Sequence, residues 1–282
     1  MDEQAAKLEI ERSILAVAKS YKNEKDFREG ARIAAEKVPA KFIDLYSEYI
    51  YGKLEPPPEI RLELNETGSL TAWIDLLQFT IFEILYNYKS EAIEFLYKIG
   101  FGEYDWTQYQ AIETLIRLAN EGIEVNQTLE KIDASIDEFR YEALIPSLRA
   151  LSTVKNQAIV ETIFKRYLEL YDEEHDRDYI ETLQLFMQNY PETALRFADP
   201  LIRFARGAGM EGLRRFERDG FKVSAALTYY ALIQDNDEIN RILKELSETV
   251  RKPKYRTAIE DGMRQIDENK IIPDFAWFNE VF

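Results

Sequence analysis

One stretch, residues 69–88, constrains the fold more than any other part of the chain. Its apolar side chains recur every three or four residues, the spacing that places them on one face of an α-helix. A helix that is apolar over most of its circumference must be covered by neighbouring helices on several sides. Polar residues such as Asp75 and Glu83 interrupt the stretch, so it predicts an interior helix and no membrane span. The apolar face comprises Leu70, Trp73, Ile74, Leu77, Ile81, Ile84, Leu85 and Tyr88, with Phe79, Phe82 and Tyr86 beside it.

The rest of the composition favours helix as well. Only 11 Gly and 9 Pro occur among 282 residues, and 46% of the residues are hydrophobic. Helix-favouring residues dominate nearly every window, which predicts an all-α protein with ample material for a core. The absence of cysteine excludes disulfides, thiolate metal sites and thiol nucleophiles. The first seven residues are acidic and lack an apolar run, so we expect no secretory signal and a cytoplasmic location.

Turn and cap residues divide the chain into three parts. Three helices are expected within residues 1–52, with Leu8, Ile10 and Ile14 inward on the first, and this part is interpreted as an N-terminal helical cap. Residues 53–68 contain Pro56, Pro57 and Pro58 and predict an extended linker. Residues 69–282 are predicted to form a helical array.

Within that array, helices are expected to start near residues 69, 90, 105, 127, 141, 156, 176, 191, 210, 222, 236 and 253. Every second start is separated by about thirty-five residues, the period of arrays built from antiparallel helix pairs. The segment beginning Asn87-Tyr88 also recurs as Asn189-Tyr190, with apolar residues at the same spacing after each. The sequence therefore predicts repeated helical hairpins.

Two segments carry a resemblance to a known superfamily. Residues 144–151 (LIPSLRAL) suggest a proline-bent helix followed by a second apolar helix, and residues 199–204 (DPLIRF) are similar. Here the chain resembles HEAT and armadillo-like α-solenoids. The resemblance implies a right-handed superhelix of antiparallel helix pairs with an extended concave surface. The last eight residues hold three Phe and one Trp, which we expect to dock as a C-terminal aromatic cap.

The net charge of −16 lies mostly between residues 61 and 190. An acidic middle disfavours nucleic acid, whose binding requires Lys and Arg to replace counterions. It favours a basic protein partner, although excess acid also serves simply to keep an aromatic-rich surface hydrated. The candidate partner-binding residues are Glu113, Glu121, Asp137, Glu138, Glu173 and Glu174.

A second candidate site lies further along the chain. Residues 207–212 match the letters of a dinucleotide fingerprint, but helix is expected before them where that motif requires a strand. Glycines opening a helix beside arginines still make an anion site possible. The alternative is a turn whose arginines pair with Glu211, Glu217 and Asp219. The anion-site residues would be Gly207, Gly209, Arg203, Arg206, Arg214, Arg215 and Arg218.

No catalytic or metal-binding motif is found. The single histidine, His175, lies in a charged stretch whose spacing matches neither a calcium loop nor a histidine pair, so no metal and no cofactor are expected. We therefore expect no enzyme but a protein-binding scaffold or adaptor for a basic partner, one version being an immunity or antagonist protein. The alternative is a helical binder or enzyme for a phosphate-bearing small molecule. The charge disfavours recognition of DNA lesions of the alkylation-repair type, and the sequence carries no signal for oligomeric state.

Overall fold

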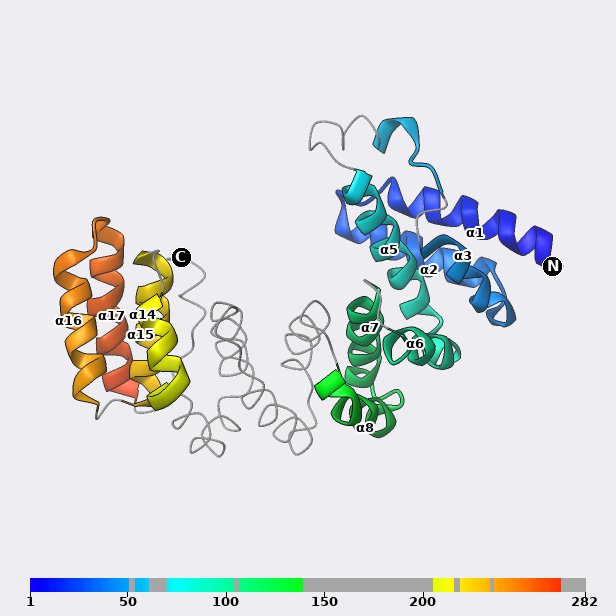
Figure 1. Cartoon of the computed structure of the whole chain (residues 1–282). Coiled ribbons are helices and arrows are strands. Elements are labelled where there is room, and N and C mark those ends of the chain that lie inside the picture. Colours follow the sequence, from blue (N-terminus) through cyan, green and yellow to red (C-terminus); the bar gives the residue numbers. More distant parts are fainter. Residues whose placement is uncertain are drawn as a thin grey trace. The chain divides into compact units, whose positions relative to one another are not determined.

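A computed structural model describes residues 1–50, 54–60, 70–103, 107–138, 205–215, 219–233 and 236–269 (Figure 1). Every regular element in these ranges is a helix, which confirms the all-α prediction. The chain divides into two compact units, Met1–Ser147 and Leu148–Phe282. Residues 139–204, for which repeated helical hairpins were predicted, lie outside the described residues. The aromatic C-terminal segment also lies outside them.

The N-terminal helices begin with side-chain caps. Asp2 accepts a hydrogen bond from the amide of Ala5 at 2.9 Å, and Asn23 accepts one from Asp26 at 3.2 Å, so each satisfies an amide that has no partner within its helix. The expected third helix is instead a 3₁₀ segment followed by one short α-helical turn, and Pro39 precedes it without a capping side chain. The elements are α1 (Glu3–Ala18), α2 (Glu24–Lys37), η1 (Ala40–Tyr46) and α3 (Ser47–Ile50).

The central stretch forms α5 (Leu70–Asn87), which packs against α1, α2, α3 and α7. Its buried position confirms the prediction of an interior helix. Three polar residues on α5 are also buried, and all have partners. The Thr80 hydroxyl donates to the Leu76 carbonyl at 2.7 Å. The Gln78 side chain donates to the Ile50 carbonyl at 3.1 Å, and Glu83 receives two hydrogen bonds from Arg117.

The predicted boundary at 53–68 does not separate the N-terminal helices from α5. They share one hydrophobic core, and the indole nitrogen of Trp73 donates to the Leu54 carbonyl at 2.7 Å. Pro56 and Pro57 lie outside any helix, and Pro58 begins a helical turn, a position where proline's missing amide costs no hydrogen bond.

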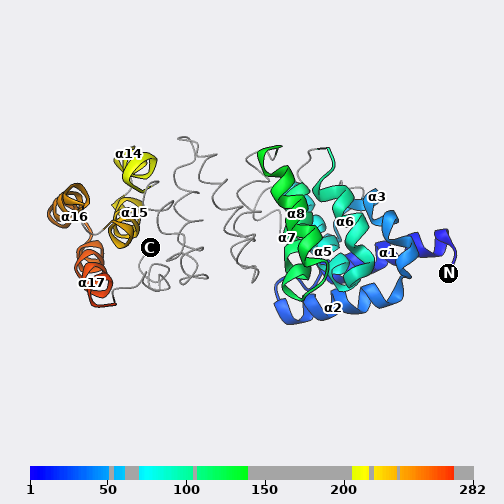
Figure 2. The same cartoon turned by 90° about the horizontal axis from the view of Figure 1, so that it is seen from below.

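The remaining helices of the first unit follow α5 after a turn in which Lys89 adopts a left-handed backbone, φ 56°. The helix α7 packs against α5, α6 and α8, so it connects these helices into one packed group (Figure 2). The elements are η2 (Lys89–Ala92), α6 (Ile93–Gly100), α7 (Gln108–Asn120), α8 (Val125–Ser135) and η3 (Ile136–Glu138).

In the second unit, α15, α16 and α17 pack against one another in all three pairings, and α14 packs on α15 (Figure 1). Asn236 caps α16 by accepting hydrogen bonds from the amides of Glu238 and Ile239. The predicted starts at 210, 236 and 253 fall within one residue of the observed ones. The elements are η5 (Ala205–Gly209), α14 (Met210–Arg215), α15 (Asp219–Leu232), α16 (Asp237–Thr249) and α17 (Pro253–Asn269).

Two large apolar residues of α1 and α5 are exposed. Leu8 was predicted to lie inward, whereas Phe79 was placed beside the apolar face of its helix. Leu8 on α1 is 51% exposed, and Phe79 on α5 is 53% exposed. The Phe79 ring nevertheless stacks on the buried ring of Phe27 from α2, with centroids 5.1 Å apart and planes 6° from parallel. The ring thus covers the edge of the core instead of entering it.

Candidate functional site

The segment containing α6, α7 and α8 has a marked acid excess. Across residues 89–103 and 107–138 there are ten acidic and four basic side chains. Three of the four bases are engaged within the unit: Arg117 with Glu83, Lys89 with Glu121, and Lys131 over the Tyr97 ring at 4.9 Å. Within these two ranges, the exposed glutamates without a basic partner are Glu91, Glu94, Glu103, Glu124, Glu130 and Glu138. The local negative charge is therefore not cancelled by neighbouring bases.

One predicted partner-binding residue, Glu121, forms contacts within the molecule. It follows α7, and its two carboxylate oxygens accept from Tyr86 and from Lys89, the latter at 2.7 Å. Lys89 also lies 3.8 Å from the centroid of the Tyr86 ring. Hydrogen bonds from Lys89 and Tyr86 favour the ionised carboxylate and lower the pKa of Glu121. This carboxylate is only partly available to a partner.

The predicted residue Glu113 lies one helical turn before Arg117 on α7. Arg117 donates to Glu83 through both terminal nitrogens, at 2.8 and 3.2 Å, and its guanidinium lies 3.9 Å from the Tyr86 ring centroid. Glu113 is exposed at the surface, yet loss of solvation raises its pKa, while nearby Arg117 lowers it and Glu83 raises it. Because Glu83 already occupies the guanidinium, Glu113 keeps a charge that its surroundings do not neutralise.

The α6 and α8 helices bring further carboxylates around Tyr97. The Tyr97 hydroxyl is 3.0 Å from the Thr128 hydroxyl, so the two helices are in contact there. Burial raises the pKa of Tyr97, Thr128 lowers it, and the negative charges of Glu124 and Glu94 raise it further, so both carboxylates lie near this phenol. Glu91 lies one turn before Glu94. We call Glu91, Glu94 and Glu124 the α6–α8 acidic surface.

The sequence pointed to charge in this region but not to the residues that carry it without compensation. Glu91, Glu94 and Glu124 were not predicted, because sequence alone does not show which acids have a basic neighbour. The helix boundary near Ser90 was the one available signal, since it placed Glu91 and Glu94 on the exposed start of a helix. Glu138 is exposed as predicted, whereas the side chain of Asp137 and residues Glu173, Glu174 and His175 lie outside the described residues.

Only part of the predicted anion site lies within the described residues. Gly207 is exposed with a non-helical backbone, and Arg206 is exposed beside it. A Cβ atom on Gly209 would lie 2.9 Å from the ring of Tyr229, so close packing accounts for this glycine. Arg214 pairs with Glu238 of α16. Glu217 and the side chain of Asp219 lie outside the described residues.

The phosphate hypothesis for this region stays a prediction. Arg203 and Arg218 and the side chain of Arg215 lie outside the described residues. The helix that the glycines open, α14, is only six residues long, so its dipole offers little to an anion.

Searches for metal ligands and membrane spans gave no candidate within the described ranges. No group of three or more His, Cys, Asp or Glu side chains there is arranged to hold a metal ion. None of the helices searched combines the length and apolarity needed to cross a bilayer.

The chain was compared with known protein families, curated proteins and solved structures. No protein-family model, curated protein or solved structure matches the chain.

Proposed function

We propose that this protein is a non-enzymatic interaction module that binds a basic protein partner through the α6–α8 acidic surface. The supporting observation is that three exposed glutamates, Glu91, Glu94 and Glu124, have no basic partner among the described residues, while three of the four bases in the segment are already engaged. A partner that supplies Lys or Arg would provide the missing countercharges.

The helical hairpins of the first unit give this surface a rigid support. The α6 helix packs on α7, and α7 packs on both α5 and α8. Buried Ile112, Leu115 and Leu118 hold α7 in place, so the carboxylates on its neighbours keep a fixed spacing. In our proposal such hairpins continue along the chain as a right-handed solenoid, and the acidic surface forms part of its concave side.

An immunity or antagonist protein that neutralises a basic toxin or nuclease is one form of this function. Charge complementarity would accelerate association with such a partner and make the rate fall with added salt. An acidic surface that imitates a phosphate backbone would also compete with the nucleic acid for a nuclease.

Retention of basic proteins from a cell lysate tests the proposal. The immobilised chain should retain a basic protein at low salt and release it at about 0.5 M salt, where the Debye length falls to a few ångströms. The variant Glu91→Gln/Glu94→Gln/Glu124→Gln should retain much less. The matched control Glu248→Gln/Glu260→Gln/Glu268→Gln removes the same charge from exposed positions of the second unit. Equal retention by both variants, or no basic protein retained by the unmodified chain, would refute the proposal.

A further inference from the structure

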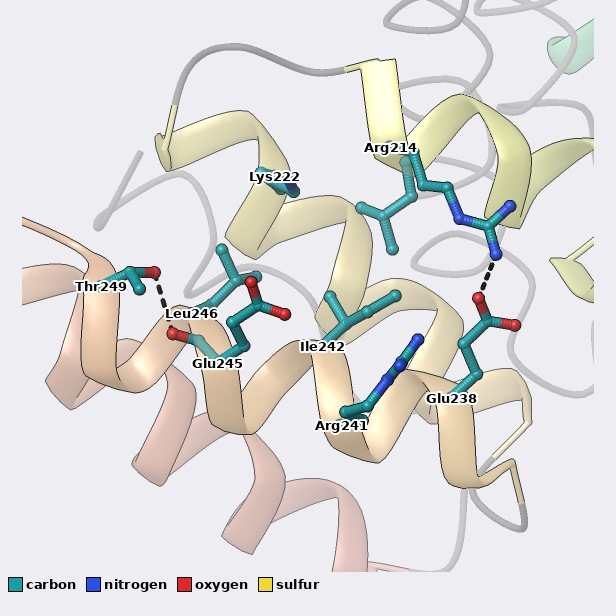
Figure 3. A pocket seen from close by; sticks show the side chains of 9 residues that line it. Arg214, Lys222, Glu238, Arg241, Ile242, Glu245, Leu246 and Thr249 are labelled. Atoms are coloured by element: carbon teal, nitrogen blue, oxygen red, sulfur yellow. Dashed lines mark hydrogen bonds and ion pairs between the residues drawn. The ribbon is translucent and has the colours of Figure 1, made fainter.

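The second unit contains a shallow pocket of about 230 Å³ between α14, α15 and α16 (Figure 3). Its apolar lining comes from Leu213 on α14 and from Ile242 and Leu246 on α16. Leu213 is fully buried and Leu246 is 6% exposed, so this lining is part of the packed structure and keeps its shape. The volume is below the usual range for drug-sized ligands, about 300–1,000 Å³, and suits a molecule of about one ring.

Two cationic side chains border the pocket from opposite helices. Lys222 projects from α15 and Arg241 from α16, as Figure 3 shows. Neither forms an ion pair within the described part of the chain, and Lys222 is half-buried. A partly desolvated ammonium without a carboxylate partner is stabilised by any anion that reaches it. The third cation, Arg214, is already held by Glu238.

One acidic side chain, Glu245, limits the charge that the pocket accepts. It lies one turn after Arg241, the spacing at which ion pairs form on a helix surface, but the two side chains do not pair here. With Arg214 and Glu238 cancelling each other, Lys222, Arg241 and Glu245 leave an excess of one positive charge. A singly charged anion neutralises that excess, whereas a dianion leaves a net negative charge beside Glu245.

We propose that this pocket binds a small carboxylic acid with an apolar body, the carboxylate between Lys222 and Arg241 and the body against Ile242. This inference is independent of the acidic surface, since it concerns the other unit of the chain. It differs from the phosphate hypothesis for the Gly207 turn both in place and in the charge of the ligand.

Phenylacetate is a suitable probe, and binding can be followed by amide chemical shifts in the full-length protein. We expect a dissociation constant of about millimolar, as befits a ligand of this size, with shifts confined to α14, α15 and α16. The neutral isostere 2-phenylacetamide should bind about tenfold more weakly, because it lacks the charge that Lys222 and Arg241 recognise. Equal affinity for the two, or shifts located elsewhere, would overturn the proposal.

Matched variants distinguish binding of phenylacetate in this pocket from its general attraction to positive charge on the second unit. Lys222→Gln/Arg241→Gln should weaken phenylacetate binding about tenfold or more. The control Lys244→Gln/Arg251→Gln removes the same charge from exposed residues of the same unit and should leave the affinity unchanged. An equal loss in both variants would contradict a built site.

The role of Glu245 has its own test. Glu245→Gln should improve the affinity for the dianion phenyl phosphate several-fold more than that for phenylacetate, since it removes one repelling charge. A uniform change, or none, would refute the proposed preference for a monoanion.

Discussion

Glu83 on α5 and Arg117 on α7 form a two-point ion pair, with nitrogen–oxygen distances of 2.8 and 3.2 Å, and the Glu83 side chain is only 5% exposed. Such a pair adds little net stability when it replaces an apolar contact, but it is costly to break from one side, because the remaining charge stays buried. It therefore fixes how α5 and α7 are aligned beneath the acidic residues of the first unit.

The first prediction concerns this pair. Arg117→Met should lower the free energy of unfolding by about 3 kcal/mol, because Glu83 would be left without its partner. The double variant Glu83→Met/Arg117→Met should recover most of that loss. Urea denaturation measures both. The control is Lys98→Met, which changes an exposed side chain of α6 and is expected to stay within about 0.5 kcal/mol of the unmodified chain. A double variant as unstable as the single one would contradict the assignment.

Glu121 gives a prediction about pH. Its pKa is lowered in the folded state, so its stabilising contribution is present above the unfolded-state pKa and is lost as the pH falls through the folded-state pKa. Since the side chain is 39% exposed, we expect Glu121→Gln to cost only about 0.5 kcal/mol at pH 7. The difference from the unmodified chain should shrink as the pH falls and vanish below the folded-state pKa of Glu121. A pH-independent difference would show that the carboxylate charge is not involved.

Glu113 should behave in the opposite sense. Its pKa is raised in the folded state, so the favourable contribution belongs to the protonated form, is complete below the unfolded-state pKa, and is lost as the pH rises through the folded-state value. Glu113→Gln should therefore stabilise the chain at pH 7 by a few tenths of a kcal/mol, given its exposure, and have no effect at low pH. Destabilisation at pH 7 would indicate that Glu113 pairs with Arg117 after all.

A fourth prediction concerns two glycines. Gly209→Ala should cost about 1–3 kcal/mol, because the added methyl would lie 2.9 Å from the buried ring of Tyr229. Gly30→Ala in α2 meets only ordinary contacts, the nearest at 3.5 Å from Val17, and should stabilise by about 0.5–1 kcal/mol through helix propensity. Thermal unfolding compares the two. A neutral Gly209→Ala would restore the possibility that this glycine serves a ligand.

Leu8 and Phe79 show that helical spacing predicts the direction in which a side chain points better than it predicts whether a neighbouring helix covers that side chain. Phe79 has the residue type of the α5 core, yet it is exposed and stacks with one face on Phe27 of α2. In the same way, spacing assigned Leu8 to the inward face of α1, but at that height of the helix no neighbour covers it. Periodicity records the direction of a side chain, and burial also depends on how far the neighbouring helix extends.

The candidate residues show the same limit for charge. Glu113 and Glu121 were predicted from the acid content of their region, and both are exposed, but only the fold shows that Glu121 is bound by Lys89 from another element. Likewise Arg214 was expected to pair with acids near it in sequence, and its partner is Glu238 on α16. Ion pairs between different helices depend on how those helices pack. The spacing of residues along one helix carries no information about that packing.

The amino-acid sequence alone determined that this is an all-helical protein, that residues 70–87 form an interior helix, and where most of the described helices begin. These follow from local propensity, capping residues and the periodicity of apolar side chains, all of which are properties of short segments. Tertiary structure decided which charges are neutralised, which glycine is required by a neighbouring ring, and where a pocket opens between α14, α15 and α16. Each of those depends on atoms from elements distant in sequence, and only the packing of the helices brings them within reach.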